Sequence, residues 1–212
     1  MNDLMSGGLH RLWKNRLIRM IRPQNHFACL DVAGGTGDIA FRIKKAAPGA
    51  DITVFDLNAH MLSVGRDRAA DRGWLDEFEW ITGNAESLPF PGNSFDLYTI
   101  AFGLRNVTHI DTALTEAMRV LKPGGRFFCL EFCPEQLPGL DKIYDFYSFN
   151  VIPRIGKIVA KDEESYQYLV ESIRKFPPPR NLVRRMQAAG MVQPRFSPLS
   201  GGIVAIHQGL KA

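Results

Sequence analysis

The chain has 212 residues, 45% of them hydrophobic and 23% charged, which fits one globular domain with a sizeable core. The formal net charge of +4 is largely local to one early segment, and no basic stretch alternates with stacking aromatics, so no nucleic acid is expected as a partner. No apolar run is long enough to cross a bilayer, and no signal peptide is visible.

The first predicted element is a helix at residues 9–21, with apolar groups at helical spacing, arginines on the other faces and Pro23 beyond its end. Strand and helix patterns then alternate. Strands are predicted at residues 27–32, 52–55, 78–82, 95–101 and 127–132. Helices are predicted at residues 39–47, at 59–70 with Asn58 as N-cap, and from Asp111, as N-cap, to residue 121, where Lys122-Pro123-Gly124-Gly125 ends the helix.

Alternating units of this length predict an α/β fold with a doubly wound, mostly parallel sheet. Residues 140–176 interrupt the alternation with an aromatic-rich stretch, interpreted as a mostly helical insertion that three prolines close. A helix at 181–189 follows, and strands at 192–197 and 202–207 form a hairpin around Ser200-Gly201, completing seven strands. We expect one domain over residues 1–212, with an N-terminal helical segment at 1–26 and the insertion at 140–180 forming a lid over the substrate site.

A glycine-rich turn with flanking carboxylates follows the first strand. Asp31 and Asp38 enclose Gly34, Gly35 and Gly37, and the G-x-G-x-x-G pattern of dinucleotide sites is absent. Two carboxylates suit a ligand with a cationic amine and a sulfonium, and suit a pyrophosphate badly. These features disfavour a nicotinamide-dependent oxidoreductase. For Asp38, the role of helix N-cap is an equally good interpretation.

Two later strands also end in polar groups. Asp56 ends the second strand, where a carboxylate can accept hydrogen bonds from both ribose hydroxyls, in NAD enzymes as well as others. Asn84 and Ala85 follow the third strand, where an amide side chain and a backbone N–H can meet an adenine edge. For Glu86 we favour a solvated loop position without a ligand, and we interpret His109 as a surface residue.

Read in order, the turn at 31–38, Asp56 and the stretch 84–90 resemble the successive S-adenosylmethionine (SAM) motifs of Rossmann-like class I methyltransferases. Residues 119–126 are similar to the turn before their fifth strand. The runs 102–108, 144–156 and 165–174, with the opening 1–6, resemble the C-methyltransferases of ubiquinone and menaquinone biosynthesis. The resemblance covers essentially the whole chain.

The resemblance implies SAM as the cofactor, held by Asp31 and the glycines of the turn and by four residues that match the ligands of the family, Thr36, Asp56, Asn84 and Ala85. Two departures stand out. Ala101 replaces a serine that some members have. The family also has a short segment with a Tyr-Asp pair before the opening stretch, and this sequence begins after it. We therefore expect a truncated N-terminus and weaker closure over SAM.

The resemblance further implies methyl transfer to a ring carbon of a demethylated polyprenyl quinol. Arg105 follows the fourth strand and is expected to stabilise the ring oxyanion, with Asn106 holding a water. A structural salt bridge is the alternative for Arg105. Tyr144 and Tyr147 are candidate substrate contacts, with packing in the lid as their alternative. The isolated cysteines Cys29, Cys129 and Cys133 indicate reduced thiols and no metal site.

A long apolar tail requires access to a membrane. The basic helix at residues 9–22 fits an anionic interface, although it could equally pack on the domain. We expect a cytoplasmic protein that contacts the inner face of the membrane, other quinone-biosynthesis proteins and a second copy of itself. Two rival functions share the cofactor motifs: a class I methyltransferase for a sterol, phenol or amine, and a SAM-binding scaffold subunit without turnover.

Overall fold

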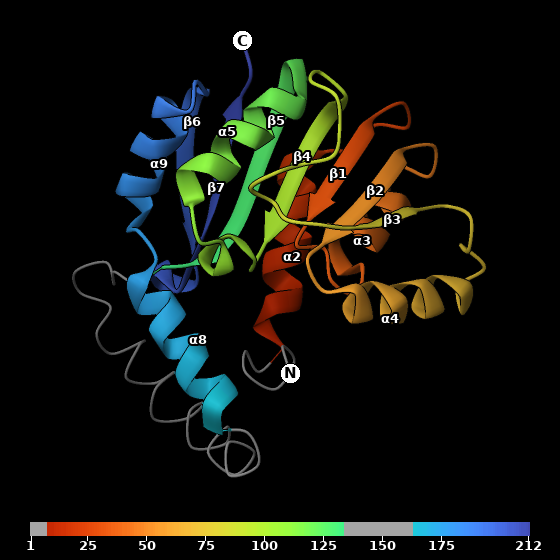
Figure 1. Ribbon diagram of the computed structural model, residues 1–212, viewed down its shortest axis with the longest axis horizontal. Coiled ribbons are helices and arrows are strands. Elements are labelled where there is room, and N and C mark those ends of the chain that lie inside the picture. The colour runs from red at the N-terminus through yellow and green to blue at the C-terminus, as the bar shows by residue number, and fades with distance from the viewer. Residues whose placement is uncertain (1–7, 134–162) are drawn as a thin grey trace.

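The computed structural model describes residues 8–133 and 163–212, and its strands form one seven-stranded sheet in the order β3-β2-β1-β4-β5-β7-β6 (Figure 1). Strand β7 is antiparallel to both of its neighbours, and the other neighbouring strands pair in parallel. The predicted doubly wound sheet and its C-terminal hairpin are therefore confirmed. The strands are β1 (Ala28–Val32), β2 (Asp51–Asp56), β3 (Glu79–Thr82), β4 (Phe95–Ala101), β5 (Leu121–Phe132), β6 (Val192–Leu199) and β7 (Val204–Leu210).

Helices cover both faces of the sheet. One face packs on α5 and α9, and the other on α2, α3 and α4 (Figure 1). Because successive strand residues point to opposite faces, Phe128 and Leu130 of β5 belong to one core layer and Phe127 and Cys129 to the other. The helices are α2 (Leu9–Ile21), α3 (Asp38–Ala46), α4 (Ala59–Ala70), α5 (Ile110–Val120), α8 (Glu163–Lys175) and α9 (Pro179–Ala188), with short 3₁₀ turns η1 (Leu104–Asn106) and η2 (Ser200–Gly202).

The two consequential boundary errors both lie around α5, and the other predicted bounds differ from the structure by at most three residues. The helix begins at Ile110, so Asp111 lies in its first turn instead of capping it, and its carboxylate pairs with Arg185 of α9. After Val120 the chain enters β5 directly, and the predicted Lys-Pro-Gly-Gly turn lies within that strand, beside an irregular pairing with β4. Sequence patterns missed this because a strand irregularity absorbs the proline and glycines.

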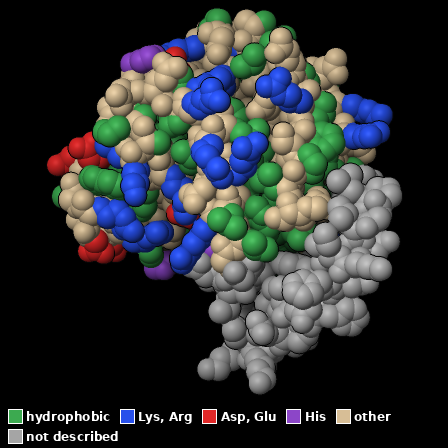
Figure 2. All heavy atoms as spheres, turned by 180° about the vertical axis from the view of Figure 1, so that it is seen from behind, with side chains coloured by type: hydrophobic (Ala, Val, Ile, Leu, Met, Phe, Trp, Pro, Cys, Tyr) green, Lys and Arg blue, Asp and Glu red, His purple; other side chains and the backbone are tan. Residues whose placement is uncertain are grey.

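Helix α2 packs on the domain through its apolar face. Leu17 and Ile21 have no exposed surface, and the indole N–H of buried Trp13 donates to Ser200 Oγ at 2.7 Å. The apolar face of α2 is therefore buried in the core. Of the two alternatives left open by the sequence, a membrane interface or packing on the domain, the second holds for this face. Arg11, Arg16 and Arg19 remain exposed on α2, and Arg22 is exposed directly after its last residue. Figure 2 shows Lys and Arg side chains spread over this side of the molecule and acidic side chains gathered mainly at one margin.

The strand order reverses between β1 and β4, and this reversal positions the site. In an open parallel sheet, a ligand crevice forms at the carboxyl ends of the strands where neighbouring crossovers diverge. Asp31, Asp56 and Arg105 lie at or just beyond the ends of β1, β2 and β4. Helix α8 belongs to the predicted insertion, whereas Tyr144 and Tyr147 lie outside the described residues. None of the described helices has the length and apolarity needed to span a membrane.

Candidate cofactor and active site

A cavity of about 550 Å³ opens at the carboxyl ends of β1, β2 and β4. It brings together nine of the ten cofactor-binding and catalytic residues predicted from the sequence, and the loop after β4 forms one wall. Gly37 is not among the lining residues, and buried Lys14 from α2, which the sequence analysis had not placed here, is one of them. The predicted residues that line the cavity are Asp31, Gly34, Gly35, Thr36, Asp56, Asn84, Ala85, Arg105 and Asn106.

The glycine turn needs its glycines for two reasons. A Cβ on Gly34 would lie 2.6 Å from Val54 Cγ1, so only glycine lets the turn approach β2. Gly35 and Gly37 have positive φ angles of 52° and 79°, which side chains rarely tolerate. Gly37 closes the turn by donating to the Gly34 carbonyl at 2.9 Å. The turn therefore exposes backbone to a ligand at the point where β1 ends.

Asp31 offers an unpaired carboxylate oxygen to this cavity. The side chain has no exposed surface; Oδ1 accepts from Thr99 Oγ1 at 2.8 Å, and Oδ2 has no hydrogen-bond partner of ordinary geometry among the described residues, although the Ala40 amide is near enough to lower the pKa of Asp31. Burial raises the pKa of Asp31 to about 7, against the lowering effect of the Thr99 hydroxyl. A buried, unpaired carboxylate calls for a cationic partner, which a ligand ammonium would supply. The site thus fits the amino-acid end of SAM.

Asp56 holds two backbone segments at the end of β2. Its Oδ2 accepts from Gly35 N and its Oδ1 from Asn58 N, each at 2.8 Å. Asn58 itself caps α4 by accepting from the amides of His60 and Met61, as predicted. Because a carboxylate has about four acceptor positions, Asp56 keeps two for ligand hydroxyls. The geometry is compatible with the ribose contact expected from the sequence.

Asp38 is an ion-pair partner instead of a helix cap. Gly37 occupies the N-cap position of α3, and Asp38 Oδ2 lies 2.6 Å from Lys14 Nζ. Arg42 Nε lies 3.3 Å from the other carboxylate oxygen. Burial tends to raise the pKa of Asp38, but Lys14 and Arg42 outweigh it and lower the pKa. Neither of the two interpretations of Asp38 from the sequence included this contact with α2.

Thr36 and Asn84, two predicted cofactor ligands, already have polar partners. The hydroxyl and carbonyl oxygens of Thr36 both accept from Arg68 Nη1 on α4. The Oδ1 of Asn84 accepts from Glu86 N at 2.9 Å, which leaves the amide nitrogen of the side chain as a donor. A donating amide can meet an acceptor on an adenine edge.

Glu86 links the loop after β3 to the start of α5. Its Oε1 accepts from the amides of Thr108 and His109 at 3.0 and 3.1 Å, and its Oε2 lies 2.7 Å from His109 Nδ1. The hydrogen bond with the His109 side chain is the main cause that lowers the pKa of Glu86. Our interpretation of Glu86 as merely solvated was incomplete, because its carboxylate pairs with His109. His109 itself is an exposed surface residue, as expected.

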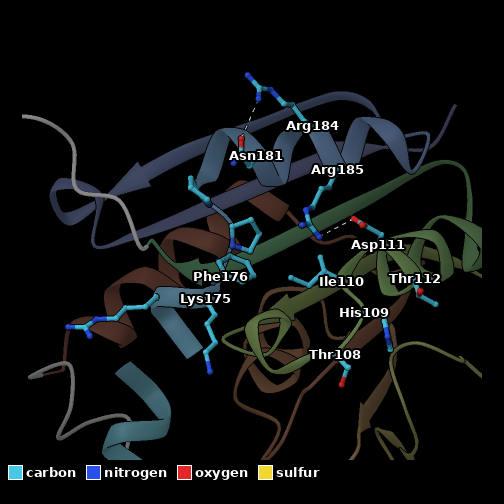
Figure 3. Close-up of a pocket in the computed structure, with 13 residues that line it drawn as sticks. Thr108, His109, Ile110, Asp111, Thr112, Lys175, Phe176, Asn181, Arg184 and Arg185 are labelled. Carbon is cyan, nitrogen blue, oxygen red and sulfur yellow. Dashed lines mark hydrogen bonds and ion pairs between the residues drawn. The ribbon is translucent and has the colours of Figure 1, made fainter. Parts of the chain in front are cut away.

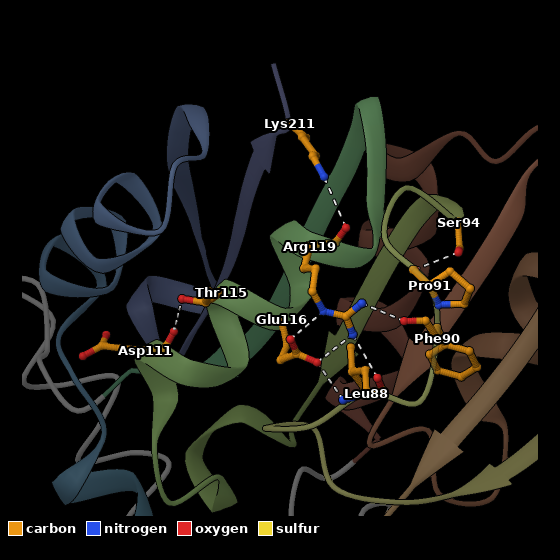
Figure 4. Close-up of polar contacts among 9 residues, drawn as sticks. All are labelled: Leu88, Phe90, Pro91, Ser94, Asp111, Thr115, Glu116, Arg119 and Lys211. Atoms are coloured by element: carbon orange, nitrogen blue, oxygen red, sulfur yellow. Dashed lines mark hydrogen bonds and ion pairs between the residues drawn. The ribbon is translucent and has the colours of Figure 1, made fainter.

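The same loop is anchored further along by one arginine. Arg119 on α5 donates to the carbonyls of Leu88 and Phe90 at 2.9 and 2.7 Å, and it pairs with Glu116 at 2.7 Å. Glu116 in turn accepts from the Leu88 amide. Figure 4 shows the guanidinium lying between α5 and the loop. These contacts fix the segment that follows Asn84 and Ala85.

Arg105 is set in a cluster of acceptors at the cavity wall. Its Nη1 lies 2.9 Å from Glu131 Oε1 and also donates to the Phe102 carbonyl, while the guanidinium carbon lies 5.6 Å from the centre of the Phe132 ring. Phe102 has a positive φ of 58°, rare for an aromatic residue. Glu131 was missed because it lies inside an apolar strand. Burial raises its pKa, and the Arg105 charge opposes the rise.

Asn106 and Gly103 complete this wall. Asn106 Oδ1 accepts from the Tyr168 hydroxyl at 3.2 Å, which connects the wall to α8. A Cβ on Gly103 would lie 2.3 Å from Ala33 Cβ, so the loops after β1 and β4 meet only because residue 103 is glycine. The cofactor turn and the Arg105 loop are thus in direct contact.

A second cavity, of about 920 Å³, lies between α5, α8 and α9. Its basic lining does not converge on one point: Arg185 points toward Asp111, whereas Arg184 lies on the other side of α9 against Asn181 (Figure 3). The first cavity is therefore the candidate site. Among the described residues, no group of three or more His, Cys, Asp or Glu side chains could hold a metal ion.

Comparison with known proteins identifies the fold and the family of this chain. A SAM-dependent methyltransferase from Aquifex aeolicus superposes with a TM-score of 0.66 at 15% identity, covering 94% of this chain and 89% of that one. The fold is thus that of SAM-dependent methyltransferases. The model of the ubiE/COQ5 methyltransferase family matches residues 1–211, and the chain belongs to that family.

Two curated relatives carry the name ubiquinone/menaquinone biosynthesis C-methyltransferase UbiE. The protein from Bradyrhizobium diazoefficiens is 57% identical over 99% of this chain and 84% of its own length. The protein from Brucella abortus (strain S19) is 55% identical over 100% of this chain and 80% of its own length. The similarity therefore includes both the cofactor turn and the Arg105 loop.

Proposed function

We propose that this protein is a SAM-dependent C-methyltransferase that methylates a ring carbon of a demethylated polyprenyl quinol in ubiquinone or menaquinone biosynthesis. The observation that carries the proposal is that one cavity has in its wall both a buried carboxylate with one unpaired oxygen, Asp31, and a fixed cation, Arg105. Relatives at 55–58% identity bear the corresponding name.

In this proposal the glycine turn and the strand ends hold the cofactor. Asp31 receives the ammonium, Gly34 and Gly35 let the backbone approach, and Asp56 accepts from the ribose hydroxyls. Asn84 and Ala85 present donors to the adenine edge, and the Thr36 hydroxyl is the remaining contact. Gly37 acts indirectly, by shaping the turn.

SAM supplies a methyl group on a cationic sulfonium. The protein must make the ring carbon nucleophilic, which happens when the adjacent ring hydroxyl loses its proton. Arg105 favours that ionisation as a fixed cation beside the oxygen, because Glu131 and the Phe102 carbonyl hold its guanidinium in place before the substrate arrives. Asn106 orients a water that takes the proton. The buried surroundings of Arg105 strengthen the attraction between this cation and the oxyanion.

The remaining features concern substrate delivery. Tyr144 and Tyr147 contact the quinol ring, and the segment at 140–180 covers it. The polyprenyl tail stays in the membrane. The exposed arginines of α2 attract the protein to anionic lipids on the cytoplasmic face of that membrane. Other quinone-biosynthesis enzymes and a second copy of the chain are further partners.

The decisive experiment is turnover with a defined substrate pair. The protein is incubated with labelled SAM and short-tailed demethyl-quinols of the benzoquinone and naphthoquinone types, and products are identified by mass spectrometry. We expect label on a ring carbon of one or both quinols. Binding of SAM without turnover of either would favour a scaffold subunit, and label on oxygen or nitrogen would favour a methyltransferase for another small molecule.

A further inference from the structure

Lys14 is a buried cation on the wall of the cofactor cavity. Only 7% of its side chain is exposed, and α2 brings it to the end of β1 from 17 residues upstream of Asp31. Its Nζ lies 2.6 Å from Asp38 Oδ2. A buried ammonium is costly unless it is paired, so this position requires an explanation.

The pair with Asp38 does not fully account for Lys14. Asp38 also has Arg42, so two cations share one carboxylate. An ammonium has three donors, and Asp38 takes one of them. Asp31 lies close enough that the Lys14 charge lowers its pKa. One end of the cavity thus combines an unpaired carboxylate oxygen with an ammonium that has spare donors, the complement of a zwitterion.

We propose that Lys14 binds the carboxylate of the cofactor's methionine moiety, next to the ammonium that Asp31 receives. This proposal rests on SAM being the cofactor and adds the residue that recognises its carboxylate. The alternative is a clamp that only joins α2 to α3 through Asp38. The two roles differ in one respect: a carboxylate-binding lysine distinguishes ligands with and without that carboxylate, whereas a clamp does not.

The test compares SAM with decarboxylated SAM, which keeps the sulfonium, the amine and the adenosine but lacks the carboxylate. Affinities are measured by calorimetry for the wild type, Lys14→Met and Lys14→Arg. A hydrogen bond to a charged group is worth roughly 1.5–3 kcal/mol, so the wild type should prefer SAM by about ten- to a hundredfold. Lys14→Met should lose that preference and bind decarboxylated SAM as the wild type does, and Lys14→Arg should recover part of it.

Lys44→Met is the matched control. Lys44 is a buried lysine on α3 that pairs with Glu77 and does not line the cavity, so its loss should leave the preference for SAM unchanged. A preference that survives in Lys14→Met would overturn the proposal. Equal weakening of both ligands would assign Lys14 to the clamp. Failure of the wild type to bind either ligand would refute SAM as the cofactor, a separate result. Melting temperatures show whether each variant is folded. We expect the Lys14 variants to fold, because Arg42 still pairs with the Asp38 carboxylate.

Discussion

Arg105 Nη1 lies 2.9 Å from Glu131 Oε1, and the Glu131 side chain has no exposed surface. The Glu131 carboxylate also accepts hydrogen bonds from the backbone amides of Phe132 and Arg105, at 2.9 and 3.3 Å. The arginine is therefore part of a buried ion pair and at the same time part of the cavity wall. The sequence posed these as alternatives, but one side chain can have both roles, and they can be separated by mutation.

Arg105→Ala should lose both stability and turnover. It strands the buried Glu131 carboxylate, which costs about 3–5 kcal/mol, and removes a cation whose loss costs on the order of 10²–10³ in rate. The double variant Arg105→Ala/Glu131→Gln should regain much of the stability, because the stranded charge is gone, but none of the turnover. Thermal melts measure stability, single-turnover rates on a demethyl-quinol measure turnover, and calorimetry shows whether SAM still binds.

The pair on α5 provides the control for this experiment. Glu116→Gln weakens a more exposed Arg–Glu pair, with Arg119, which does not line the cavity but anchors the loop after Ala85. It should therefore affect SAM affinity at most and leave the single-turnover rate of folded enzyme at saturating SAM near that of the wild type. If the double variant recovers stability and turnover together, Arg105 has only a structural role.

Asp56→Ala should weaken SAM binding at least tenfold, because two ribose hydrogen bonds to a charged group are lost. It also frees the amides of Gly35 and Asn58, so a loss of stability is expected as well. Asp56→Asn keeps acceptor capacity on one oxygen and should fall between. Calorimetry with SAM and with free methionine separates the effects: methionine binding should change little if only the ribose contact is removed.

Asp31→Asn should stabilise the ligand-free protein at alkaline pH while impairing SAM binding. Burial raises the pKa of Asp31 to about 7, so the folded state holds this proton more tightly than the unfolded state. Stability from Asp31 is therefore present at acidic pH and lost as pH rises toward 7, by about 4 kcal/mol in total. The asparagine variant has no carboxyl group to ionise at this position, so it does not lose this stability as pH rises. Urea titrations of both proteins at pH 5 and pH 8 should show a variant advantage that is larger at pH 8; an equal difference at both would contradict the prediction.

His207→Leu should remove a loss of stability in acid. His207 on β7 is buried, neither ring nitrogen has a hydrogen-bond partner of ordinary geometry among the described residues, and burial lowers its pKa to about 4, although the Pro179 carbonyl opposes the shift. The unfolded state binds this proton first, so stability falls as pH drops from about 6.5 toward 4, by about 3 kcal/mol. Melting curves between pH 7 and 4.5 should show the variant gaining on the wild type as pH falls.

The sequence by itself determined the sheet, the carboxyl ends of its parallel strands and much of the site. Asp31, Asp56 and Arg105 were predictable because each lies at or just beyond the carboxyl end of a strand, and the carboxyl ends of parallel strands meet at one edge. The same holds for the glycine turn, whose conformation is set by local backbone sterics. Asn58 was recognised as a cap for the same reason, since capping involves neighbours only two or three residues away.

Only the tertiary structure decided which charges meet across elements. Lys14 reaches Asp38 over 24 residues and Arg105 reaches Glu131 over 26, and the periodicity of one helix or strand carries no information about a partner on another. The position of α2 shows the same limit: an amphipathic pattern states that one face is apolar, but not whether a membrane or a core covers it. Here the core covers it, and this packing brings Lys14 to the cofactor cavity.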